Sequence, residues 1–314
     1  MPPITRDLSV GVVGAGRVGT ALGLALSRAG YRLVGVSARS TAARDRAREL
    51  LPGVPLLPPA AVAQASDILL LTVNDDAIEP VAGELVAAGS VHNGQYVLHV
   101  SGAHGLAVLR PATAVGAIPG AIHPAMTFPG RTTDVDNLAG SAFAVTAPDA
   151  VRPAMEQFVR NLGGVPVWVA DADRTLYHAG LVLGANNLIT LIAAAMQALA
   201  AAGVQDPSLV LGPLVRGSLE NALRLGDAAL TGPVRRGDTG TVAAHIEALA
   251  EHTPDLVASY LQFGLATARR ARAAGLADAA AVDRVITLLD NQIASRNDHA
   301  ARQVTTPDGE IADR

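Results

Sequence analysis

Three glycines near the start of the chain constrain its fold more than any other feature. Gly14, Gly16 and Gly19 form the pattern G-x-G-x-x-G, which follows an apolar stretch, Ser9–Val13, and opens an Ala- and Leu-rich stretch, Val18–Ala29. Between a strand and a helix, these glycines permit a tight turn, the close approach of a pyrophosphate and close packing of helix on strand. The helix would direct its first amide groups and its dipole at that anion. The pattern therefore predicts a dinucleotide-binding turn.

The first half of the chain alternates between strand and helix patterns. The stretch DILLLTV is continuously apolar, which is typical of a strand buried on both faces of a parallel sheet. Strands separated by helices predict an α/β domain with a doubly wound parallel sheet. The predicted strands are Ser9–Val13, Tyr31–Ser37, Asp67–Val73, Tyr96–Val100, Val115–His123, Ala142–Thr146 and Val165–Val169, and the predicted helices are Val18–Ala29, Ala42–Leu51, Ala77–Ala88 and Val151–Leu162.

No strand pattern appears after Ala170, and the rest of the chain reads as helices separated by polar loops. We therefore expect two domains, a nucleotide-binding domain over residues 1–170 and an all-α domain over 171–297, followed by a disordered polar tail over 298–314. The predicted helices of the second domain span 171–202, 206–226, 239–250, 253–274 and Asp278–Ser295.

The composition excludes several kinds of chemistry. The 314 residues include no cysteine, which excludes disulfides, thiolate nucleophiles and zinc–thiolate sites and is typical of a cytoplasmic protein. All 24 residues of the Lys+Arg count are arginine, so no side-chain amine can act as a base or form a Schiff base. The net charge of −4 includes no basic stripe for nucleic acid or a membrane surface. The start, MPPITRDLSV, has no signal-peptide pattern, so we expect a cytoplasmic protein whose partners are small molecules.

The longest apolar run, Leu181–Val204, is long enough to span a membrane. Asn186, Asn187, Thr190 and Gln197 interrupt it, and polar amides are costly at mid-membrane depth. We therefore predict a buried helix of a soluble core. Because this much apolar surface is hard to cover within a small helical domain, we also expect a homodimer through the C-terminal helices.

The end of the second predicted strand indicates which dinucleotide is bound. An NAD-binding protein usually has Asp or Glu there to bind the ribose hydroxyls. This chain instead has Arg39 followed by Ser40 and Thr41. The arginine could pair with a 2′-phosphate and the hydroxyls could assist it, so NADP is predicted over NAD; a solvated arginine is the alternative. Asn74 and Asp75 follow the third predicted strand and could contact the cofactor, but turn formation and helix capping would explain them equally well. The other predicted cofactor neighbours are Arg17, Val18, Val73, Ser101 and Gly102.

Two further predicted strands end in residues that could do chemistry at the same edge of the sheet. Ser101 and Gly102 could offer a hydroxyl and a backbone amide to a carboxylate or to the nicotinamide amide, although an ordinary turn is equally plausible. His123 precedes a proline that holds it extended, and its imidazole could exchange protons near neutrality or be bound by a backbone carbonyl. A metal site of His99, His104 and His123 is disfavoured, because no acidic ligand adjoins them and their spacing matches no zinc pattern.

The stretch RTLYHAGLVLGANN opens the long helix with three polar side chains. In a regular α-helix, His178 and Asn186 differ by a rotation of about 80° and a rise of about 12 Å, so they can border one cleft. Asn187 points about 180° away from His178 and is interpreted as structural. Arg174, one turn before His178, and Arg236 could bring positive charge to an anionic substrate. A buried interhelical hydrogen bond is the alternative for Asn186, and a solvated loop position is the alternative for Arg236.

These motifs together resemble the bacterial family with a Rossmann-like domain followed by a conserved domain of unknown function. The matching pieces are GVVGAGRVGTAL, LLLTVNDDAI, HVSGAHG, HPAMTF, YHAGLVLGANN and LTGPVRRGD, which span nearly everything from residue 9 to 250. That family is similar to the 6-phosphogluconate dehydrogenase-like group, including ketopantoate reductase and hydroxyisobutyrate dehydrogenase. The resemblance implies an N-terminal Rossmann domain and an all-α second domain that is often dimeric.

The chain departs from that wider group at the residues that do its chemistry. The related enzymes have a lysine early in the first helix of the second domain, where this chain has His178. They have asparagines one or two turns later, where this chain has Val182 and Asn186. Because the chain contains no lysine, a lysine-dependent mechanism is excluded.

A local resemblance supports the same class of reaction. Prephenate dehydrogenase-like enzymes carry a serine after one strand and a His-Pro pair after the next, as Ser101 and His123 do here, and deazaflavin-dependent NADP reductases share the N-terminal domain. The resemblances imply an NADP-dependent oxidoreductase that passes a hydride between nicotinamide and a small oxo or hydroxy acid. His178 or His123 would act as acid or base, Asn186 would orient the reacting oxygen, and Ser101 or Arg236 would hold a carboxylate. The alternative is a non-catalytic NADP-binding sensor or regulatory protein.

Overall fold

The computed structural model of the protein describes residues 4–131 and 133–304. The chain divides into two compact units between Asn186 and Asn187, and each unit is described by itself. The predicted domain boundary near residue 170 lies at the end of the last strand, whereas the first helical turns that follow belong to the first unit.

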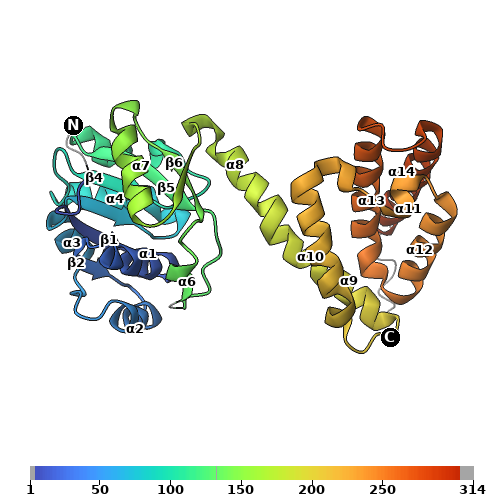
Figure 1. Ribbon diagram of the computed structural model, residues 1–314, viewed down its shortest axis with the longest axis horizontal. Coiled ribbons are helices and arrows are strands. Elements are labelled where there is room, and N and C mark those ends of the chain that lie inside the picture. The colour runs from blue at the N-terminus through green and yellow to red at the C-terminus, as the bar shows by residue number, and fades with distance from the viewer. Residues whose placement is uncertain (1–3, 132, 305–314) are drawn as a thin grey trace, which may run out of the picture. The chain divides into compact units, whose positions relative to one another are not determined.

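The first unit contains a seven-stranded sheet in the order β2-β1-β3-β4-β5-β6-β7 (Figure 1). Because β2 and β3 lie on opposite sides of β1, the direction of strand addition reverses there. Open α/β sheets bind ligands beyond the carboxyl ends of the strands at such a switch point, which here holds the glycine turn. The strands are β1 Ser9–Val13, β2 Arg32–Ser37, β3 Ile68–Leu71, β4 Tyr96–His99, β5 Ile118–Pro124, β6 Ala142–Thr146 and β7 Val165–Trp168.

Helices cover both faces of this sheet. Along β3, Ile68 and Leu70 pack into the core that includes α1 and α7, while Leu69 and Leu71 pack into the core that includes α3, α4 and α5. The continuous apolar run of this strand therefore serves two cores, as its sequence predicted. The helices are α1 Arg17–Arg28, α2 Thr41–Leu50, α3 Pro59–Gln64, α4 Ile78–Ala87, α5 Arg110–Ala114, α6 Thr133–Asp136 and α7 Arg152–Asn161.

Every strand predicted from the sequence is confirmed, with ends that differ by three residues or fewer. The short helices α3, α5 and α6 were not predicted, because four to six residues are too few to show helical periodicity.

The sheet is mainly parallel, as expected from the sequence, with the exception that β6 runs antiparallel to β5. Pro124 pairs with Phe143, so the connection from β5 to β6 begins and ends at the same edge of the sheet and no crossover is needed. The registers pair His99 with Ala121 and Ala121 with Thr146. The reversed strand β6 therefore ends level with the end of β4, and this brings the chain after β7 back to the ligand-binding edge.

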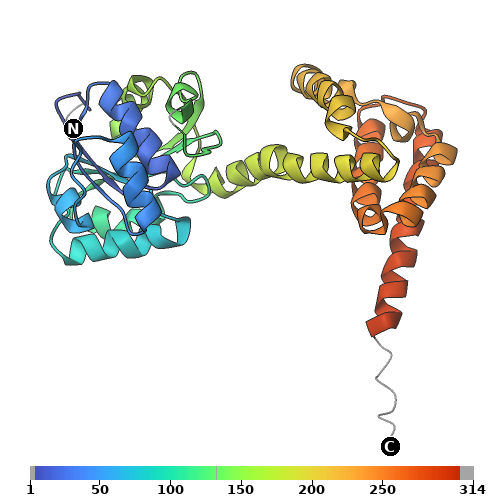
Figure 2. The ribbon, with the colours of Figure 1, turned by 90° about the horizontal axis from the view of Figure 1, so that it is seen from below.

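The first unit ends in the helix α8 Arg174–Leu181 and a π-helical turn over Val182–Asn186. The second unit begins directly after it and is entirely helical in its described residues, as predicted. Figure 2 shows α14, in red, as one long helix. The helices of this unit are α9 Asn187–Ala201, α10 Pro207–Leu225, α11 Gly232–Arg236, α12 Thr239–His252, α13 Val257–Ala273 and α14 Ala279–Val304.

The apolar run Leu181–Val204 is helical as far as Ala201 but not buried, so the prediction of a buried core helix is wrong for the single chain. The core of the second unit is formed by α11, α12, α13 and α14, and α9 and α10 contain no buried residue. Those four helices already cover one another, which leaves α9 and α10 on the outside of this core. By length and composition alone, 171–201 is the one described segment that could cross a membrane.

The last helix extends into the segment that was expected to be disordered. Residues 298–304, which were predicted to be disordered, form the end of α14. Residues 305–314 lie outside the described part of the chain.

Candidate functional site

The glycine turn joins β1 to α1 and is pinned to the neighbouring strand. Gly14 has a φ of +107°, a backbone conformation that glycine adopts without strain. The N–H groups of Gly14 and Ala15 both donate to the carbonyl of Ser37 at the end of β2, at 3.2 and 2.8 Å. Apart from its neighbours along the sequence, no atom lies within 4 Å of the place where a Cβ on Gly16 would stand. The backbone at the start of α1 is therefore open to a ligand.

Thr72 fixes this turn from the next strand. Its hydroxyl donates to the carbonyl oxygen of Gly14 at 2.6 Å. A Cβ on Gly19 would overlap both that carbonyl and the Thr72 hydroxyl, so Gly19 allows α1 to pack directly on the turn. Thr72 was not predicted from the sequence, where its signal was a hydroxyl at the end of an otherwise apolar strand.

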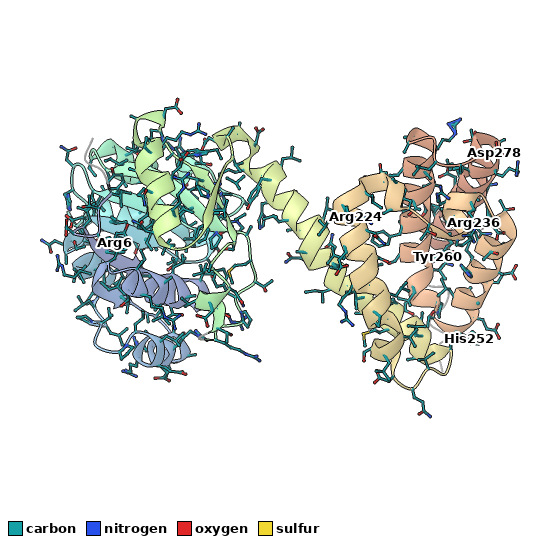
Figure 3. The ribbon with its side chains drawn as sticks, in the orientation of Figure 1. Arg6, Arg224, Arg236, His252, Tyr260 and Asp278 are labelled. Carbon is teal, nitrogen blue, oxygen red and sulfur yellow. The ribbon has the colours of Figure 1, made fainter. Side chains whose placement is uncertain are left out.

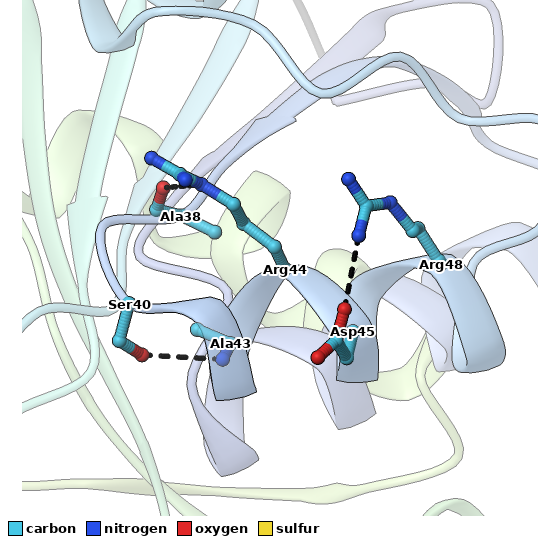
Figure 4. A network of polar contacts seen from close by, with 6 residues as sticks. All are labelled: Ala38, Ser40, Ala43, Arg44, Asp45 and Arg48. Atoms are coloured by element: carbon cyan, nitrogen blue, oxygen red, sulfur yellow. Dashed lines mark hydrogen bonds and ion pairs between the residues drawn. The ribbon is translucent and has the colours of Figure 1, made fainter.

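A cavity of about 480 Å³ opens at the end of β2. Arg39 and Arg44 both line it and are exposed. Arg44 donates from Nε to the carbonyl of Ala38 at 3.3 Å, which draws its guanidinium over the turn (Figure 4). Ser40 caps α2 by accepting a hydrogen bond from the N–H of Ala43 at 3.2 Å. The hydroxyl of Ser40 is therefore engaged, and the second basic group at this end is Arg44, which the sequence analysis did not identify.

Arg48, a further arginine of α2, differs from Arg44. Arg48 pairs with Asp45 at 2.9 Å, as Figure 4 shows, so its charge is offset within the helix. Thr41, a predicted cofactor neighbour, is the first residue of α2 and is exposed. The opposite wall of the cavity is apolar and consists of Leu56, Leu57, Pro58 and Pro59.

A second cavity, of about 190 Å³, lies where β4 and β5 end. Gly102 lies between two imidazoles of its lining: a Cβ there would stand 2.6 Å from Cδ2 of His178 and 3.0 Å from Nε2 of His123. The two rings are perpendicular, with centroids 6.2 Å apart. The lining brings together predicted residues from separate parts of the first unit: Val18, Asp75, Ser101, Gly102, His123 and His178.

Ser101 shapes this cavity through its loop. Its hydroxyl donates to Asp75 Oδ2 at 2.8 Å and accepts from the N–H groups of Ala103 and His104 at 3.2 and 3.1 Å. The Ser101 hydroxyl, which was predicted to bind a carboxylate of a ligand, is therefore already hydrogen-bonded within the protein. Its backbone is held as well, because its carbonyl accepts from a buried arginine.

His99 supports the same loop from beneath. It is fully buried, its Nδ1 accepts from the N–H of Ser101 at 3.2 Å, and its Nε2 lies 3.0 Å from the carbonyl of Gly105. The proton therefore resides on Nε2, which donates to that carbonyl. Burial lowers the pKa of His99 to about 4, so the ring is neutral at pH 7.

His123 is held by a residue that the sequence analysis missed. Its Nδ1 lies 3.1 Å from the hydroxyl of Tyr177 on α8. Burial is the main cause that lowers the pKa of His123 to about 4, and the positive charge of Arg174 and the neighbouring His178 act in the same direction. Asp75 opposes them. His123 is therefore neutral at pH 7.

Arg174 has no exposed surface with which to contact a ligand. Its terminal nitrogens donate to the carbonyl of Ser101 at 2.5 Å and to the hydroxyl of Thr146 at 3.0 Å, and its Nε has no hydrogen-bond partner. Both described partners are neutral, so a buried positive charge lies behind the loop that forms the cavity. It ties the start of α8 to the ends of β4 and β6.

The two asparagines do not line this cavity. The π-helical turn over Val182–Asn186 takes more residues per turn than an α-helix, so the predicted rotation of 80° between His178 and Asn186 does not apply. Asn186 and Asn187 are both exposed, and the division between the two units falls between them.

The remaining predicted residues lie apart from the cavity lining. Arg17, the first residue of α1, and Asn74, after β3, are exposed, and Val73 is half-buried. Arg236 ends α11 in the second unit (Figure 3). In the described part of the chain, no group of three or more His, Asp or Glu side chains could hold a metal ion.

Two family models match the chain. A Rossmann-like domain matches residues 4–124, and a domain of unknown function, DUF2520, matches residues 141–267. A comparison with curated proteins found no match.

Several solved structures share the fold at low identity. A candidate NADP oxidoreductase from Bacteroides fragilis is 20% identical with a TM-score of 0.70, over 83% of this chain and 98% of that one. A reductive aminase from Aspergillus terreus, in complex with NADPH and ethyl levulinate, is 18% identical with a TM-score of 0.57, over 92% and 94%. Pyrroline carboxylate reductase from Plasmodium falciparum, with NADP bound, is 12% identical with a TM-score of 0.53, over 90% and 99%.

At these identities the likeness establishes the fold and not the substrate. The predicted combination of domains is confirmed by the family models. The chain therefore contains a Rossmann-like domain followed by the domain of unknown function DUF2520.

Proposed function

We propose that the protein is an NADP-dependent oxidoreductase that transfers a hydride between nicotinamide and a small oxo or hydroxy acid. The observation that carries this proposal is the cavity with two imidazoles, which lies at the same edge of the sheet as the open glycine turn. Val18 of the fingerprint helix and Asp75 after β3 belong to the lining of that cavity. A dinucleotide extended along this edge would end beside His123 and His178.

The residues at this edge fit a dinucleotide. The open backbone at Gly16 and the amide groups at the start of α1 suit a pyrophosphate. The cavity after β2 joins an apolar wall to two guanidinium groups, which suits an adenine ring and an adjoining phosphate. Arg39 and Arg44 therefore favour NADP over NAD. The NADP-containing neighbours support the same choice.

The cavity supplies what hydride transfer needs from the protein. Bound NADPH would supply the hydride itself. A carbonyl that receives a hydride also needs a proton at its oxygen, and His123 and His178 are the titratable rings that face one another across Gly102. The buried charge of Arg174 behind Ser101 would attract an anionic substrate and favours an acid.

A C=N substrate is the second candidate, and Asp75 favours it. This carboxylate lies in the cavity lining, where it would stabilise a positively charged iminium carbon. Two neighbours, a reductive aminase and a pyrroline carboxylate reductase, have names that point to such compounds.

Transfer from labelled cofactor tests the proposal directly. The purified protein is incubated with NADPH deuterated at C4 and with separate panels of 2-oxo acids and cyclic imines, and deuterium in the product is measured by mass spectrometry. We expect transfer to a member of the oxo-acid panel; transfer only to imines would support the second candidate. Tight NADPH binding without transfer to either panel would favour a sensor or regulatory protein.

Substitution of the histidines tests their part in the reaction. In single-turnover measurements, His178→Asn and His123→Asn should each slow hydride transfer, since loss of an acid or hydrogen-bond donor typically costs about 10²-fold or more. Rates that stay unchanged in both variants would contradict the proposed site.

We also propose that a second copy of the chain covers the outer helices of the second unit. Apolar side chains are exposed along both helices, including Leu209 at 73% and Leu223 at 82%. A soluble monomer rarely exposes an apolar patch of this extent. The further exposed apolar residues are Ile189, Leu191, Met196, Val210, Leu214, Leu219 and Leu225.

A protein partner fits these helices better than a lipid bilayer does. α10 packs against α9 and carries Arg216, Glu220 and Arg224 among its leucines, and Figure 3 labels Arg224 on this helix. Placing α9 across a membrane would carry those charges to membrane depth, at a cost of about 2.5–3.5 kcal/mol for each arginine. At a protein interface they can remain at the rim in water.

A further inference from the structure

A tyrosine on α8 engages one ring nitrogen of His123 and leaves the other at the cavity. The hydroxyl of Tyr177 lies 3.1 Å from Nδ1, and the two rings meet edge to face with centroids 5.8 Å apart. Nε2 of the same ring stands 3.0 Å from the place of a Cβ on Gly102, on the side toward His178. The two nitrogens of His123 therefore have different neighbours, and their roles can be distinguished.

The direction of the Tyr177–His123 hydrogen bond decides which nitrogen carries the proton. A neutral imidazole has one N–H and one acceptor nitrogen, and His123 is neutral at pH 7 because its pKa is lowered to about 4. Burial raises the pKa of Tyr177, so the phenol keeps its proton and can donate it. An imidazole nitrogen accepts hydrogen bonds well. A bond from the Tyr177 hydroxyl to Nδ1 would place the ring proton on Nε2.

We propose that Tyr177 is a positioning residue that holds His123 in the Nε2-protonated tautomer, so that His123 donates a hydrogen bond into the cavity and does not act as a base. Three other groups influence this ring. Arg174 lies behind Ser101, Asp75 lies in the cavity lining, and His178 lies across Gly102. Of these, His178 is the remaining imidazole in the cavity and takes the proton-exchanging role.

The part of this inference that concerns turnover rests on the proposed function. In that reaction, Nε2–H of His123 would hold the oxygen of the oxo group and His178 would exchange the proton. The tautomer itself needs no substrate, so the two hypotheses can fail separately.

NMR measures the tautomer in the full-length protein. Long-range ¹H–¹⁵N spectra at pH 7 distinguish a protonated ring nitrogen from a bare one, and His123→Asn identifies the signals of His123. We expect a bare Nδ1 and a protonated Nε2 in the natural protein. In Tyr177→Phe the donor is lost, and the signals of His123 should shift toward a mixture of the two tautomers.

The second unit provides a matched control. Tyr260, labelled in Figure 3, lies 2.9 Å from Nδ1 of His245, and their rings meet edge to face with centroids 5.9 Å apart. Tyr260→Phe should change the signals of His245 and leave those of His123 unchanged. A protonated Nδ1 on His123 in the natural protein, or unchanged His123 signals in Tyr177→Phe, would overturn the proposal.

Kinetics separates positioning from general structural damage. Where hydride transfer is measured, Tyr177→Phe should lower kcat about tenfold, the factor expected for one hydrogen bond of ordinary strength, with an unchanged KM for NADPH. A raised KM for NADPH with an unchanged kcat would show that Tyr177 only shapes the cofactor site.

Discussion

At Gly102 the absence of a side chain leaves room for two imidazole rings. A methyl group there would stand 2.6 Å from Cδ2 of His178 and 3.0 Å from Nε2 of His123, closer than carbon atoms approach without movement. Both contacts are to the ends of side chains, which can turn aside without unfolding the sheet. Gly102→Ala should therefore change the thermal midpoint by only a few degrees, while single-turnover hydride transfer falls about tenfold or more. A large fall in the thermal midpoint together with the slower hydride transfer would mean that the glycine serves folding and not the cavity.

The two arginines at the end of β2 allow a graded test of cofactor choice. Arg39→Asp introduces a carboxylate that suits ribose hydroxyls and repels a 2′-phosphate, so NADP binding should weaken by about 10²-fold while NAD binding changes little. Arg44→Ala should weaken NADP binding about tenfold, since one guanidinium is lost and none is reversed. Arg48→Ala on the same helix is the control, because Arg48 already pairs with Asp45. Fluorescence titration of NADP and NAD measures all three variants; equal losses for both dinucleotides would contradict a 2′-phosphate site.

At the scale of elements, the loop after β4 couples the cavity to acid stability. His99 beneath the loop and His123 beside it have pKa values lowered to about 4, compared with about 6.5 in an unfolded chain. Between these values the unfolded chain binds more protons, so stability falls as the pH drops from about 6.5 to 4 and does not fall further from this cause below pH 4. Each ring should cost about 1–2 kcal/mol between pH 7 and pH 5.

Urea unfolding at pH 7 and pH 5 measures this loss. His99→Gln keeps an amide that can reach the carbonyl of Gly105, and it removes one of the two titrating rings. The difference in unfolding free energy between the two pH values should therefore shrink by about half in this variant. A difference as large as that of the natural protein would show that other groups cause the acid sensitivity.

Periodicity and motifs predicted the elements well, but not the contacts that organise the site. Gly14, Gly16 and Gly19 identified the ligand-binding edge because their spacing follows directly from the turn they form. Tyr177 and Thr72 gave no comparable signal, since each acts on a residue more than fifty positions away. The π-helical turn over Val182–Asn186 was also not predicted, because its residues are as apolar as those of an α-helix. Long-range partners of single side chains depend on tertiary packing, which periodicity does not encode.

For the whole molecule, the apolar surface of the second unit has the largest consequence. Residues 181–204 were predicted to form a core helix, because hydropathy does not distinguish burial within a chain from burial between chains. The core of α11, α12, α13 and α14 is formed without it, and leucines of α9 and α10 remain exposed. In the proposed symmetric dimer, the same patch on two copies would cover itself.

Leu223→Glu tests this dimer. Leu223 is 82% exposed on α10, so the change should not affect the fold of a monomer, but at a dimer interface it removes apolar contact worth about 2 kcal/mol and buries a charge. The dissociation constant, measured by analytical ultracentrifugation, should rise about thirtyfold or more. Val165→Glu is the control, because Val165 is 51% exposed on β7 of the first unit. A protein that sediments as a monomer at all concentrations would refute the dimer, and association only in the presence of lipid vesicles would favour the membrane alternative for 171–201.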